Sequence, residues 1–338
     1  MTAIHPAGPP AVVSPVPDTV PSLRLQAAPG AGPLAAALRE AVELLLGAGR
    51  LRLARPGERA DLLHTVGEVD GDAGLAAYRV HTVDRIPLRG HELVATRRWA
   101  RRERRRAARC AVWLTHGRTA GRIVVEAALA PGERVRCLPV LSPWHAPGAG
   151  SRDGGAAERG AVRRELGIRP GVRLVVGVVP ARRTAMLGDW AAAVERLGRS
   201  DVHVLRLSGE AGRAPAHPAG RLPLPALLEA ADLFVAAGQD LSAVSPGVSA
   251  LAMGLPVVAV TTDSAAELVT SGLNGNVVAP RDDAIADAVA AHLDEARPPR
   301  RVVPTADDRP AAHALARGLL EIYRQALSGP GTSRRWTR

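Results

Sequence analysis

The sequence predicts an α/β fold in which two Rossmann-like, doubly wound domains face each other across a cleft. Short apolar runs with the length of strands alternate with amphipathic runs of helical period along most of the chain. The apolar residues are mostly Ala, Val and Leu, and aromatic residues make up only 2% of the 338. This composition suits parallel strands covered by helices better than a β-sandwich, and the length suits two domains of ordinary size.

The first predicted domain extends from residue 22 to residue 141. A strand-like run at 22–26, a glycine-bearing turn and a helix-like run at 33–49 form a strand, turn and helix unit of the Rossmann kind. The rest of this half predicts strands at 50–54, 60–67, 78–83, 111–117 and 134–141, a long arginine-rich helix at 91–110 and a further helix at 119–130.

Residues 142–160 predict a linker, because this stretch is rich in Gly, Pro, Ser and Ala and has no apolar period over 142–158. The alternation resumes in a second domain at 161–297, and its regularity implies parallel strands joined by right-handed helical crossovers. Two such domains place a ligand cleft between the carboxyl ends of their sheets. The remaining segments are a disordered lead at 1–21, a second linker at 298–307, a C-terminal helix at 308–328 and a tail at 329–338.

Individual apolar and amphipathic runs predict the strands and helices of the second domain. Its predicted strands lie at 173–179, 202–209, 231–238, 256–260 and 276–280, and its predicted helices lie at 187–198, 224–230, from Pro246 onward, at 265–272 and at 284–296.

The chain is strongly basic, with a formal net charge of +11, and it contains Arg but no Lys. The densest run is Arg97–Arg109, which as a helix presents arginine around most of its circumference, with Trp99 as an interfacial anchor. We expect peripheral contact with an anionic membrane through this run. Nucleic-acid binding is disfavoured, because aromatic residues for base stacking are scarce and no known nucleic-acid module is present. A solvated helix face remains the alternative.

Targeting signals and metal motifs are not evident. No apolar run reaches the length of a membrane span, and the proline-rich N-terminus lacks the order of a secretory signal. We therefore expect a cytoplasmic protein, with any membrane contact peripheral and at the inner face. Cys110 and Cys137 lie in apolar stretches without CxxC spacing, which indicates neither a zinc site nor a disulfide framework.

One short run predicts an anion-binding helix start. Ser245 is a good N-cap, Pro246 a good first helical residue, and Gly247 would let a ligand approach the backbone. Backbone N–H groups at a helix N-terminus can hold a phosphate without a metal ion. An ordinary helix cap explains the same residues.

The second half also carries a family resemblance. The runs "ADLFVAAG", "ALAMGLPVVAV" and "AAELVTSGLNGNVVAP" stand in an order and spacing that resemble the C-terminal domain of the retaining, nucleotide-sugar-dependent glycosyltransferases of the GT-B fold. The resemblance covers roughly residues 163–296. In the first half, "ADLLHTVG", "YRVHTVD" and "VRCLPVLSP" resemble the family's strands more loosely, and the final helix would by similarity cross back to the first domain.

The resemblance implies a phosphate site after the first strand of the second domain. In the family a G-R-x-x-x-x-K loop supplies two cations for the donor diphosphate. Here Gly177 is the glycine, Val178 stands at the arginine position, and Arg183 stands at the lysine position with Arg182 beside it. Arginine can hold a phosphate through its planar fork, so Arg183 is the expected donor anchor. A solvated loop arginine is the alternative.

The family's sugar-gripping and ribose-gripping carboxylates are replaced. Ser249 stands where the resemblance implies a Glu that holds the ribose, and Val248 is adjacent to it in the implied donor site. The position of the second Glu is a leucine, and Asp240 lies one residue away. Glu267 matches the family without substitution, although a carboxylate at a helix terminus is the alternative reading.

The resemblance also suggests two catalytic candidates in the first domain. Asp84 stands at the position of a histidine that contacts the donor sugar in the family, and could act as an acid or base. Its alternative is an ion pair with Arg85 or Arg89. His64 lies close to this position in sequence and is the second candidate, although a strand histidine is more often a core residue.

The implied function is transfer of a sugar, with retention, from a nucleotide-diphosphate sugar to an acceptor that is a glycan, a lipid-linked molecule or a small molecule. The resemblance implies no cofactor and no obligatory metal. A non-catalytic GT-B relative that binds a sugar nucleotide, a glycan or a protein is the alternative. A dinucleotide oxidoreductase is disfavoured, because Gly30 and Gly32 supply only part of a G-x-G-x-x-G fingerprint and Ala35 takes the third place.

Overall fold

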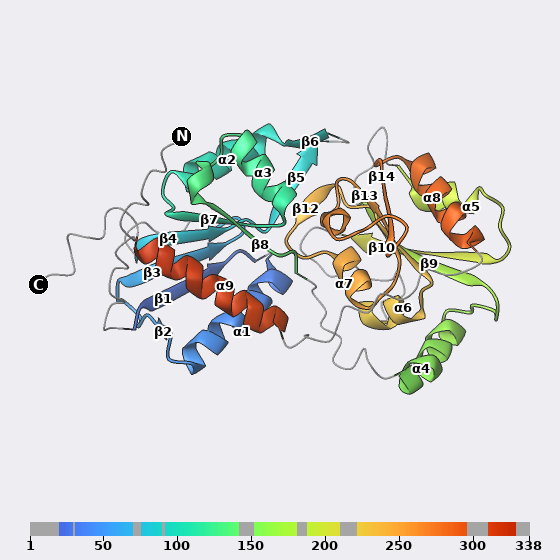
Figure 1. Ribbon diagram of the computed structural model, residues 1–338, viewed down its shortest axis with the longest axis horizontal. Helices are drawn as coiled ribbons and strands as arrows, with labels where there is room; N and C mark the ends of the chain where they lie inside the picture. Colours follow the sequence, from blue (N-terminus) through green and yellow to red (C-terminus); the bar gives the residue numbers. More distant parts are fainter. Residues whose placement is uncertain are drawn as a thin grey trace, which may run out of the picture.

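Two parallel β-sheets, one in each half of the chain, form the framework of the protein (Figure 1). Each sheet carries helices on both faces, so the chain has the two α/β domains that the sequence predicts. The computed structural model describes residues 20–29, 31–69, 76–89, 92–141, 152–180, 188–209, 222–295 and 310–328.

The first sheet is wholly parallel and has the strand order β2-β1-β3-β4-β7-β8. Helices α1 and α9 pack on one face, and α2 and α3 pack on the other. The central strands are buried on both faces, which explains why they appear as continuous apolar runs. The elements are β1 (Ser22–Ala27), α1 (Gly32–Gly47), β2 (Arg52–Leu53), β3 (Ala60–Val66), β4 (Ala76–Thr82), α2 (Arg97–Ala107), β7 (Val112–His116), α3 (Arg118–Glu126), η2 (Gly132–Arg134) and β8 (Val135–Leu138).

The second sheet is also parallel, with the order β10-β9-β11-β13-β14. Helices α4, α6 and α7 pack on one face, and α5 and α8 on the other. The elements are α4 (Arg152–Glu165), β9 (Arg173–Pro180), α5 (Trp190–Glu195), β10 (Val202–Gly209), α6 (Leu224–Ala230), β11 (Leu233–Ala236), α7 (Pro246–Ala252), β13 (Val257–Val260), η3 (Ser264–Glu267), β14 (Gly275–Val278) and α8 (Asp282–Asp294).

A third, small sheet joins the two domains. Strands β5 (Arg85–Arg89) and β6 (Glu92–Ala95) come from the first half, and β12 (Asp240–Ser242) comes from the second. Strand β12 pairs antiparallel with β5, so the order is β12-β5-β6. Because backbone hydrogen bonds cross from one domain to the other here, this sheet fixes how the carboxyl ends of the two large sheets meet.

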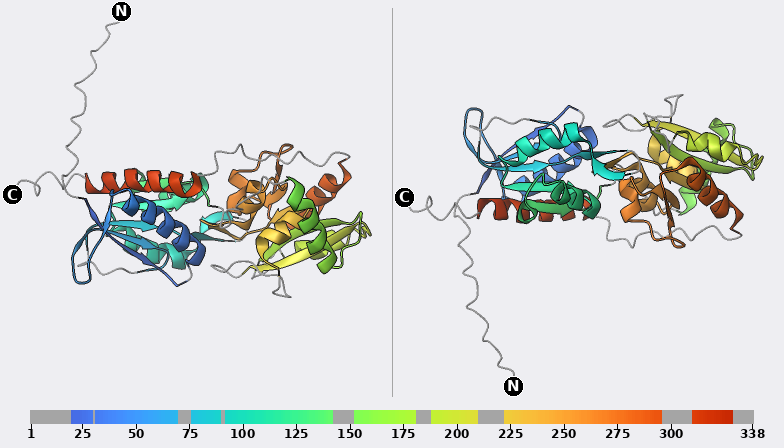
Figure 2. Two further views of the ribbon diagram at one scale, coloured as in Figure 1. Left: turned by 90° about the horizontal axis from the view of Figure 1, so that it is seen from below. Right: turned by 90° about the horizontal axis from the view of Figure 1, so that it is seen from above.

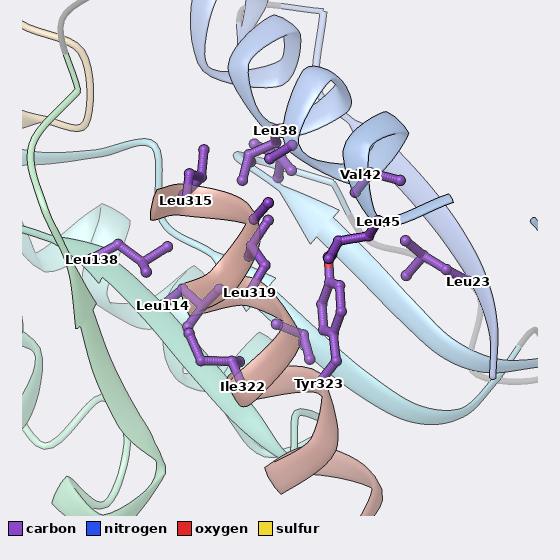
Figure 3. Close-up of a cluster of buried hydrophobic side chains, with 14 of the residues drawn as sticks. Leu23, Leu38, Val42, Leu45, Leu114, Leu138, Leu315, Leu319, Ile322 and Tyr323 are labelled. Carbon is purple, nitrogen blue, oxygen red and sulfur yellow. The ribbon is translucent and has the colours of Figure 1, made fainter. Parts of the chain in front are cut away.

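Helix α9 (Pro310–Leu327) returns from the second half to the first domain (Figure 2). Its apolar side chains gather among those of α1 and of strands β1, β7 and β8 (Figure 3). The fully buried Tyr323 hydroxyl lies 2.6 Å from Nδ1 of His64 on β3. This buried polar contact fixes the helix against the centre of the first sheet.

Besides strands β5 and β12 of the small sheet, which were not predicted, the structure differs from the sequence predictions at three places. Residues 92–95, predicted as helix, form strand β6, because Ala95 pairs with Leu88 in the small sheet and α2 begins only at Arg97. Helix α4 begins at Arg152, inside the predicted linker, and Arg159 anchors it by donating to the carboxylate of Asp232 at 2.7 Å.

The third difference is the helix predicted at 265–272, which is the short turn η3 instead. The side chain of Asn274 accepts from the backbone N–H of Thr270 and donates to the carbonyl of Leu268. These local bonds satisfy backbone groups that a longer helix would have used, so the chain turns into β14.

Tyr323→Phe tests the contact that holds α9. Removing the hydroxyl leaves Nδ1 of the buried His64 without this partner, so we expect the free energy of unfolding to fall by about 1–3 kcal/mol. The measurement is urea unfolding monitored by circular dichroism. The matched control is Tyr78→Phe, at a half-buried tyrosine of β4. Equal losses in both variants would show that the hydroxyl of Tyr323 has no special role.

Candidate functional site

Polar groups from both domains meet around the small sheet. We call the region formed by β5, β12, the residues up to Ser245, and η3 the domain junction. It lies beyond the carboxyl ends of β4 in the first sheet and of β11 and β13 in the second. Ligands of doubly wound folds bind at such edges, so the domain junction is the candidate site.

Two half-buried carboxylates, one from each domain, flank an arginine in the domain junction. Asp84 follows β4, and its backbone carbonyl accepts from the N–H of Ala243 at 2.7 Å. Asp240 opens β12, and its Oδ2 lies 3.9 Å from Nη1 of Arg85. The sequence names both aspartates as candidates, and the pairing of β12 with β5 brings them to the same place.

The ionisation of these aspartates is altered by their surroundings. Burial raises the pKa of Asp240 to about 6; Arg85 opposes that rise, and the carboxylates of Asp263 and Asp84 add to it. Burial also raises the pKa of Asp84, again against the effect of Arg85. A carboxyl group with a pKa near 6 can change its protonation state close to neutral pH, as acid and base groups of enzymes do.

Ser245 contacts another side chain rather than the backbone of the helix that it precedes. It makes no side-chain cap of α7, and its hydroxyl donates to Oδ1 of Asp263 at 3.0 Å. Oδ2 of Asp263 accepts from the backbone N–H of Gly238, and Oδ1 also accepts from that of Ala265. The hydroxyl of Ser245 is therefore bound to a carboxylate of the protein itself.

Gly247, Val248 and Ser249 serve packing. A Cβ atom at Gly247 would lie 2.7 Å from the Cβ atoms of Ala236 and Ala265, so the glycine makes room for protein atoms and not for a ligand. Val248 belongs to the core of the second domain, and the fully buried Ser249 has its hydroxyl 3.4 Å from the carbonyl of Ser245. The geometry corrects the expectation that these residues line a donor site.

Gly177 likewise has a packing role. A Cβ atom there would lie 2.6 Å from the ring of Trp190 and 2.7 Å from Cβ of Val235. The indole N–H of Trp190 donates to the carbonyl of Val178 at 3.0 Å, which holds the ring over the strand. Arg182 and Arg183, the expected phosphate anchors, lie outside the described residues.

Glu267 bridges the two domains. Its carboxylate accepts from the backbone N–H groups of Arg118 and Thr119, at 2.8 and 2.6 Å, at the start of helix α3 in the first domain. A Cβ atom at Gly117, where φ is +83°, would lie 2.9 Å from this carboxylate. Glu267 is therefore a carboxylate at a helix terminus, which was the alternative to a site role. The helix is α3 of the first domain and not a helix of its own domain.

The histidines of the first sheet are core residues. Besides Tyr323, His64 contacts the hydroxyl of Thr82 at 2.6 Å, and burial lowers its pKa to about 3. Both ring nitrogens are thus engaged away from solvent, which corrects the expectation of a catalytic His64. His81 is buried as well, with Nδ1 2.8 Å from the hydroxyl of Thr65 and Nε2 3.4 Å from the carboxylate of Glu103.

Sequence reasoning missed Asp263, which lies in the domain junction, and His116, which ends β7 in the first domain. Asp263 was overlooked because the resemblance supplied no role for it, although an aspartate directly after a strand and before a turn is a common cap. His116 ends β7, donates from Nδ1 to the carbonyl of Pro139 at 2.8 Å, and has its Nε2 buried without a partner among the described residues. Burial lowers the pKa of His116 to about 4, so the ring is neutral.

The arginine-rich helix α2 exposes charge but no aromatic anchor. Trp99 is only 3% exposed and packs in the core beneath α2, so the expectation that it anchors at an interface is wrong. Arg102 pairs with Glu68, and Arg104 donates to the carbonyl of Ala127. Within the ranges that the structure describes, every helix is too short or too polar to span a membrane. In the same ranges no group of three or more His, Cys, Asp or Glu side chains could hold a metal ion.

Glu267→Gln tests the contact between the domains. The glutamine side chain has only one acceptor oxygen, so its NH2 group would face one of the two backbone N–H donors. We therefore expect faster hydrogen exchange at the backbone amides of Arg118 and Thr119 and a loss of about 1–2 kcal/mol in the free energy of unfolding. Mass-spectrometric hydrogen exchange measures the first and urea unfolding the second. Glu126→Gln at the exposed far end of α3 is the control, and unchanged exchange at Arg118 and Thr119 would contradict the assignment.

The chain resembles known proteins in its second domain and in its whole fold. Residues 188–295 match the family described as glycosyl transferases group 1. No curated protein matches the sequence. HepE from Anabaena, solved in complex with UDP and glucose, is 14% identical with a TM-score of 0.51, and the match covers 90% of this chain and 98% of that one.

Two further solved structures agree with this assignment. Sucrose-phosphate synthase from Thermosynechococcus elongatus is 12% identical with a TM-score of 0.54, covering 90% of this chain and 94% of that one. A glycosyltransferase from Rickettsia africae is 11% identical with a TM-score of 0.54, covering 91% and 99%. The chain therefore has the two-domain GT-B fold, and residues 188–295 of its second domain match the family of glycosyl transferases group 1.

Proposed function

We propose that the protein transfers a sugar from a nucleotide-diphosphate sugar to an acceptor. The observation that carries this proposal is the family match over residues 188–295, which spans the elements from α5 to α8 of the second domain. The structure of HepE in complex with UDP-glucose supports the same class of donor. Donor binding by the second domain at the domain junction is thus the arrangement that we propose.

The chemistry that we propose uses the groups around Arg85. Asp240 in its ionised form accepts a hydrogen bond from a hydroxyl of the transferred sugar, and Asp84 faces the same sugar from the first domain. Arg183, a sequence-based anchor, would hold the diphosphate as its bond to the sugar breaks. Front-face transfer with retention, and the absence of an obligatory metal, follow from the family resemblance and are part of the proposal.

A non-catalytic relative is the second candidate, and a specific observation favours it. The hydroxyl of Ser249 and the carboxylates of Asp263 and Glu267 are engaged with protein atoms instead of facing an open position. Such a protein would bind a sugar nucleotide, a glycan or a partner protein without turnover. Binding and turnover must therefore be measured separately.

The deciding experiment measures both on the same preparation. Calorimetric titration with UDP, GDP, ADP and their common sugar conjugates, with NAD as a control, identifies the bound donor. Release of the nucleoside diphosphate, followed with and without added glycans, lipid-linked acceptors and small sugars, measures turnover. Binding with acceptor-dependent release supports a transferase; binding without release supports the second candidate; no binding to any nucleotide contradicts the proposal.

Asp240→Asn tests the role of the carboxylate. The pKa of Asp240 is about 6, so ionised Asp240 prevails above that pH and is lost below it. We expect kcat for transfer to fall as the pH drops through 6 in the unaltered protein. In the variant, kcat should be lower by roughly ten- to hundredfold, the value of one charge-assisted hydrogen bond, and should show no such step. Asp287→Asn on the exposed face of α8 is the control, and an unchanged profile in Asp240→Asn would remove Asp240 from the mechanism.

A peripheral contact with an anionic membrane is part of the proposal. Exposed arginines of α2 support it, and because Trp99 is buried the contact would be electrostatic, without insertion of an aromatic ring. We expect the protein to sediment with phosphatidylglycerol vesicles at low salt and to be released as salt rises. Replacing Arg98, Arg101 and Arg105 by Gln should abolish sedimentation. Binding to neutral phosphatidylcholine vesicles, or binding that salt does not reverse, would contradict an electrostatic contact.

A further inference from the structure

The end of strand β7 holds a buried histidine with one unused acceptor. His116 is only 3% exposed, and its Nδ1 donates to the backbone carbonyl of Pro139 at 2.8 Å. A carbonyl can only accept, so the proton of the neutral ring is on Nδ1 and the free lone pair is on Nε2. Nε2 is buried and has no hydrogen-bond partner among the described residues. A buried acceptor of this kind costs free energy until a donor pairs with it.

His116 lies where the second domain enters the first sheet. Asp84 and Leu141 follow β4 and β8, the two strands beside β7. Ala243 of the second domain stands between them: its N–H donates to the carbonyl of Asp84 at 2.7 Å, and its carbonyl accepts from the N–H of Leu141 at 2.9 Å. Ala243 thus takes the place into which β7 would continue beyond His116. The histidine therefore borders the domain junction at the carboxyl edge of the first sheet.

The residue after His116 also contacts the second domain. A Cβ atom at Gly117 would lie 2.9 Å from the carboxylate of Glu267, which accepts from the next two backbone N–H groups of the first domain. Two segments of the second domain, around Ala243 and around Glu267, thus meet the end of β7. Doubly wound folds bind their ligands at such an edge, so a donor for Nε2 is expected from a bound ligand.

The ring can accept a hydrogen bond but does not attract an anion. Burial lowers the pKa of His116 to about 4, against the effect of the bond to Pro139, so the ring is uncharged at neutral pH. An ionised phosphate or carboxylate oxygen presents lone pairs, and two acceptors repel each other. A hydroxyl group donates to Nε2 and keeps its own lone pairs for other partners. These properties favour a neutral hydroxyl compound, such as a sugar.

We infer that Nε2 of His116 accepts a hydrogen bond from a sugar hydroxyl group bound between the two domains. The inference rests on the proposed function, since sugar transfer brings hydroxyl groups of both substrates to this edge. The hydroxyl belongs either to the transferred sugar of the donor or to the acceptor. His116 then determines specificity, because a substrate that lacks this hydroxyl leaves the buried acceptor unpaired.

Two substitutions separate Nε2 from the structural bond of Nδ1. His116→Asn keeps a side-chain N–H group near the position of Nδ1, which can still donate to Pro139, and has no atom at the position of Nε2. His116→Gln places an acceptor oxygen near the position of Nε2 and loses the donor at Nδ1. His292→Asn is the matched control, because His292 is also buried but lies in α8 of the second domain.

Three measurements on each protein distinguish the two sources of the hydroxyl. Calorimetric titration with UDP-glucose, GDP-mannose and ADP-glucose, and with the corresponding nucleoside diphosphates, reports on the transferred sugar. Release of the diphosphate at increasing concentrations of glycerol and methyl glucosides and mannosides gives the KM for the acceptor. The NMR resonance of Nε2 in protein with ¹⁵N-labelled histidine, identified by its loss in the His116 variants, reports on the hydrogen bond itself.

The expected result for His116→Asn is one of two changes of about tenfold. Weaker binding of a sugar nucleotide, with unchanged binding of its diphosphate, assigns the hydroxyl to the donor sugar. A higher KM for the acceptor, with kcat and donor affinity nearly unchanged, assigns it to the acceptor. In either case the urea midpoint of His116→Asn should equal or exceed that of the unaltered protein, whereas His116→Gln should unfold at lower urea but retain binding.

Unchanged donor affinity and acceptor KM in folded His116→Asn would overturn the inference. An equal loss of affinity for the diphosphate alone would also overturn it, because the nucleotide and not a sugar would then contact Nε2. If His116→Asn does not fold, the Nε2 resonance of the unaltered protein decides. A shift with a sugar nucleotide or a glycoside, but not with the diphosphate, supports the inference, and the absence of any shift contradicts it.

Failure of the inference and failure of the proposed function give different results. Transfer by the unaltered protein, with equal donor affinity and acceptor KM in His116→Asn, overturns the role of His116 and leaves the transferase. A shift of the Nε2 resonance with a sugar nucleotide or a glycoside, without any transfer, supports the role of His116 and contradicts the transferase.

Discussion

The antiparallel pairing of β12 with β5 is the contact on which the arrangement of the molecule depends. It places backbone hydrogen bonds between two domains that otherwise have separate cores. Leu241 of β12 is buried with Ile86 of β5 in the core beneath α2 and α3, so the second domain contributes a side chain to the core of the first. The carboxyl ends of the two parallel sheets meet at this point, and every candidate residue in the domain junction owes its place to the pairing.

Two further contacts between distant segments reinforce this arrangement. The carboxylate of Glu267 satisfies two backbone N–H groups at the start of α3, which would otherwise need a partner from solvent. Helix α9 closes the chain on itself through the buried contact between Tyr323 and His64. Polar groups buried in this way cost free energy unless they are paired, so the β12–β5 pairing and the Glu267 contact favour one relative placement of the two sheets, and the Tyr323 contact fixes α9 on the first domain.

The domain junction thus combines an architecture found in other solved structures with internally satisfied polar groups. The neighbours with a GT-B fold share the placement of the two sheets at low sequence identity. In this chain, the carboxylate of Asp263 and that of Glu267 take hydrogen bonds from backbone N–H groups that face the junction. Asp84, Arg85 and Asp240 are the half-buried charged groups that remain at the edge. The charged groups at the edge support the transferase proposal, and the carboxylates bound to protein N–H groups support the non-catalytic alternative.

The sequence by itself determined the fold class, the approximate position of most strands, and the family resemblance of the second domain. These follow from local periodicity and from runs such as "ALAMGLPVVAV", which depend on neighbours in the chain. It also named Asp84 and Asp240 as candidates, because the family resemblance places them at or beside positions that contact the sugar.

Only the tertiary structure decided what the side chains at this edge contact. Ser249 and Gly247 match site positions in sequence, yet one is fully buried and the other packs between two alanines. Glu267 caps a helix that begins 149 residues earlier in the chain, and the hydroxyl of Ser245, predicted as a helix cap, donates to Asp263 instead. Long-range contacts of this kind depend on how two domains dock. Local periodicity carries no information about docking, and for that reason the sequence alone could not predict these contacts.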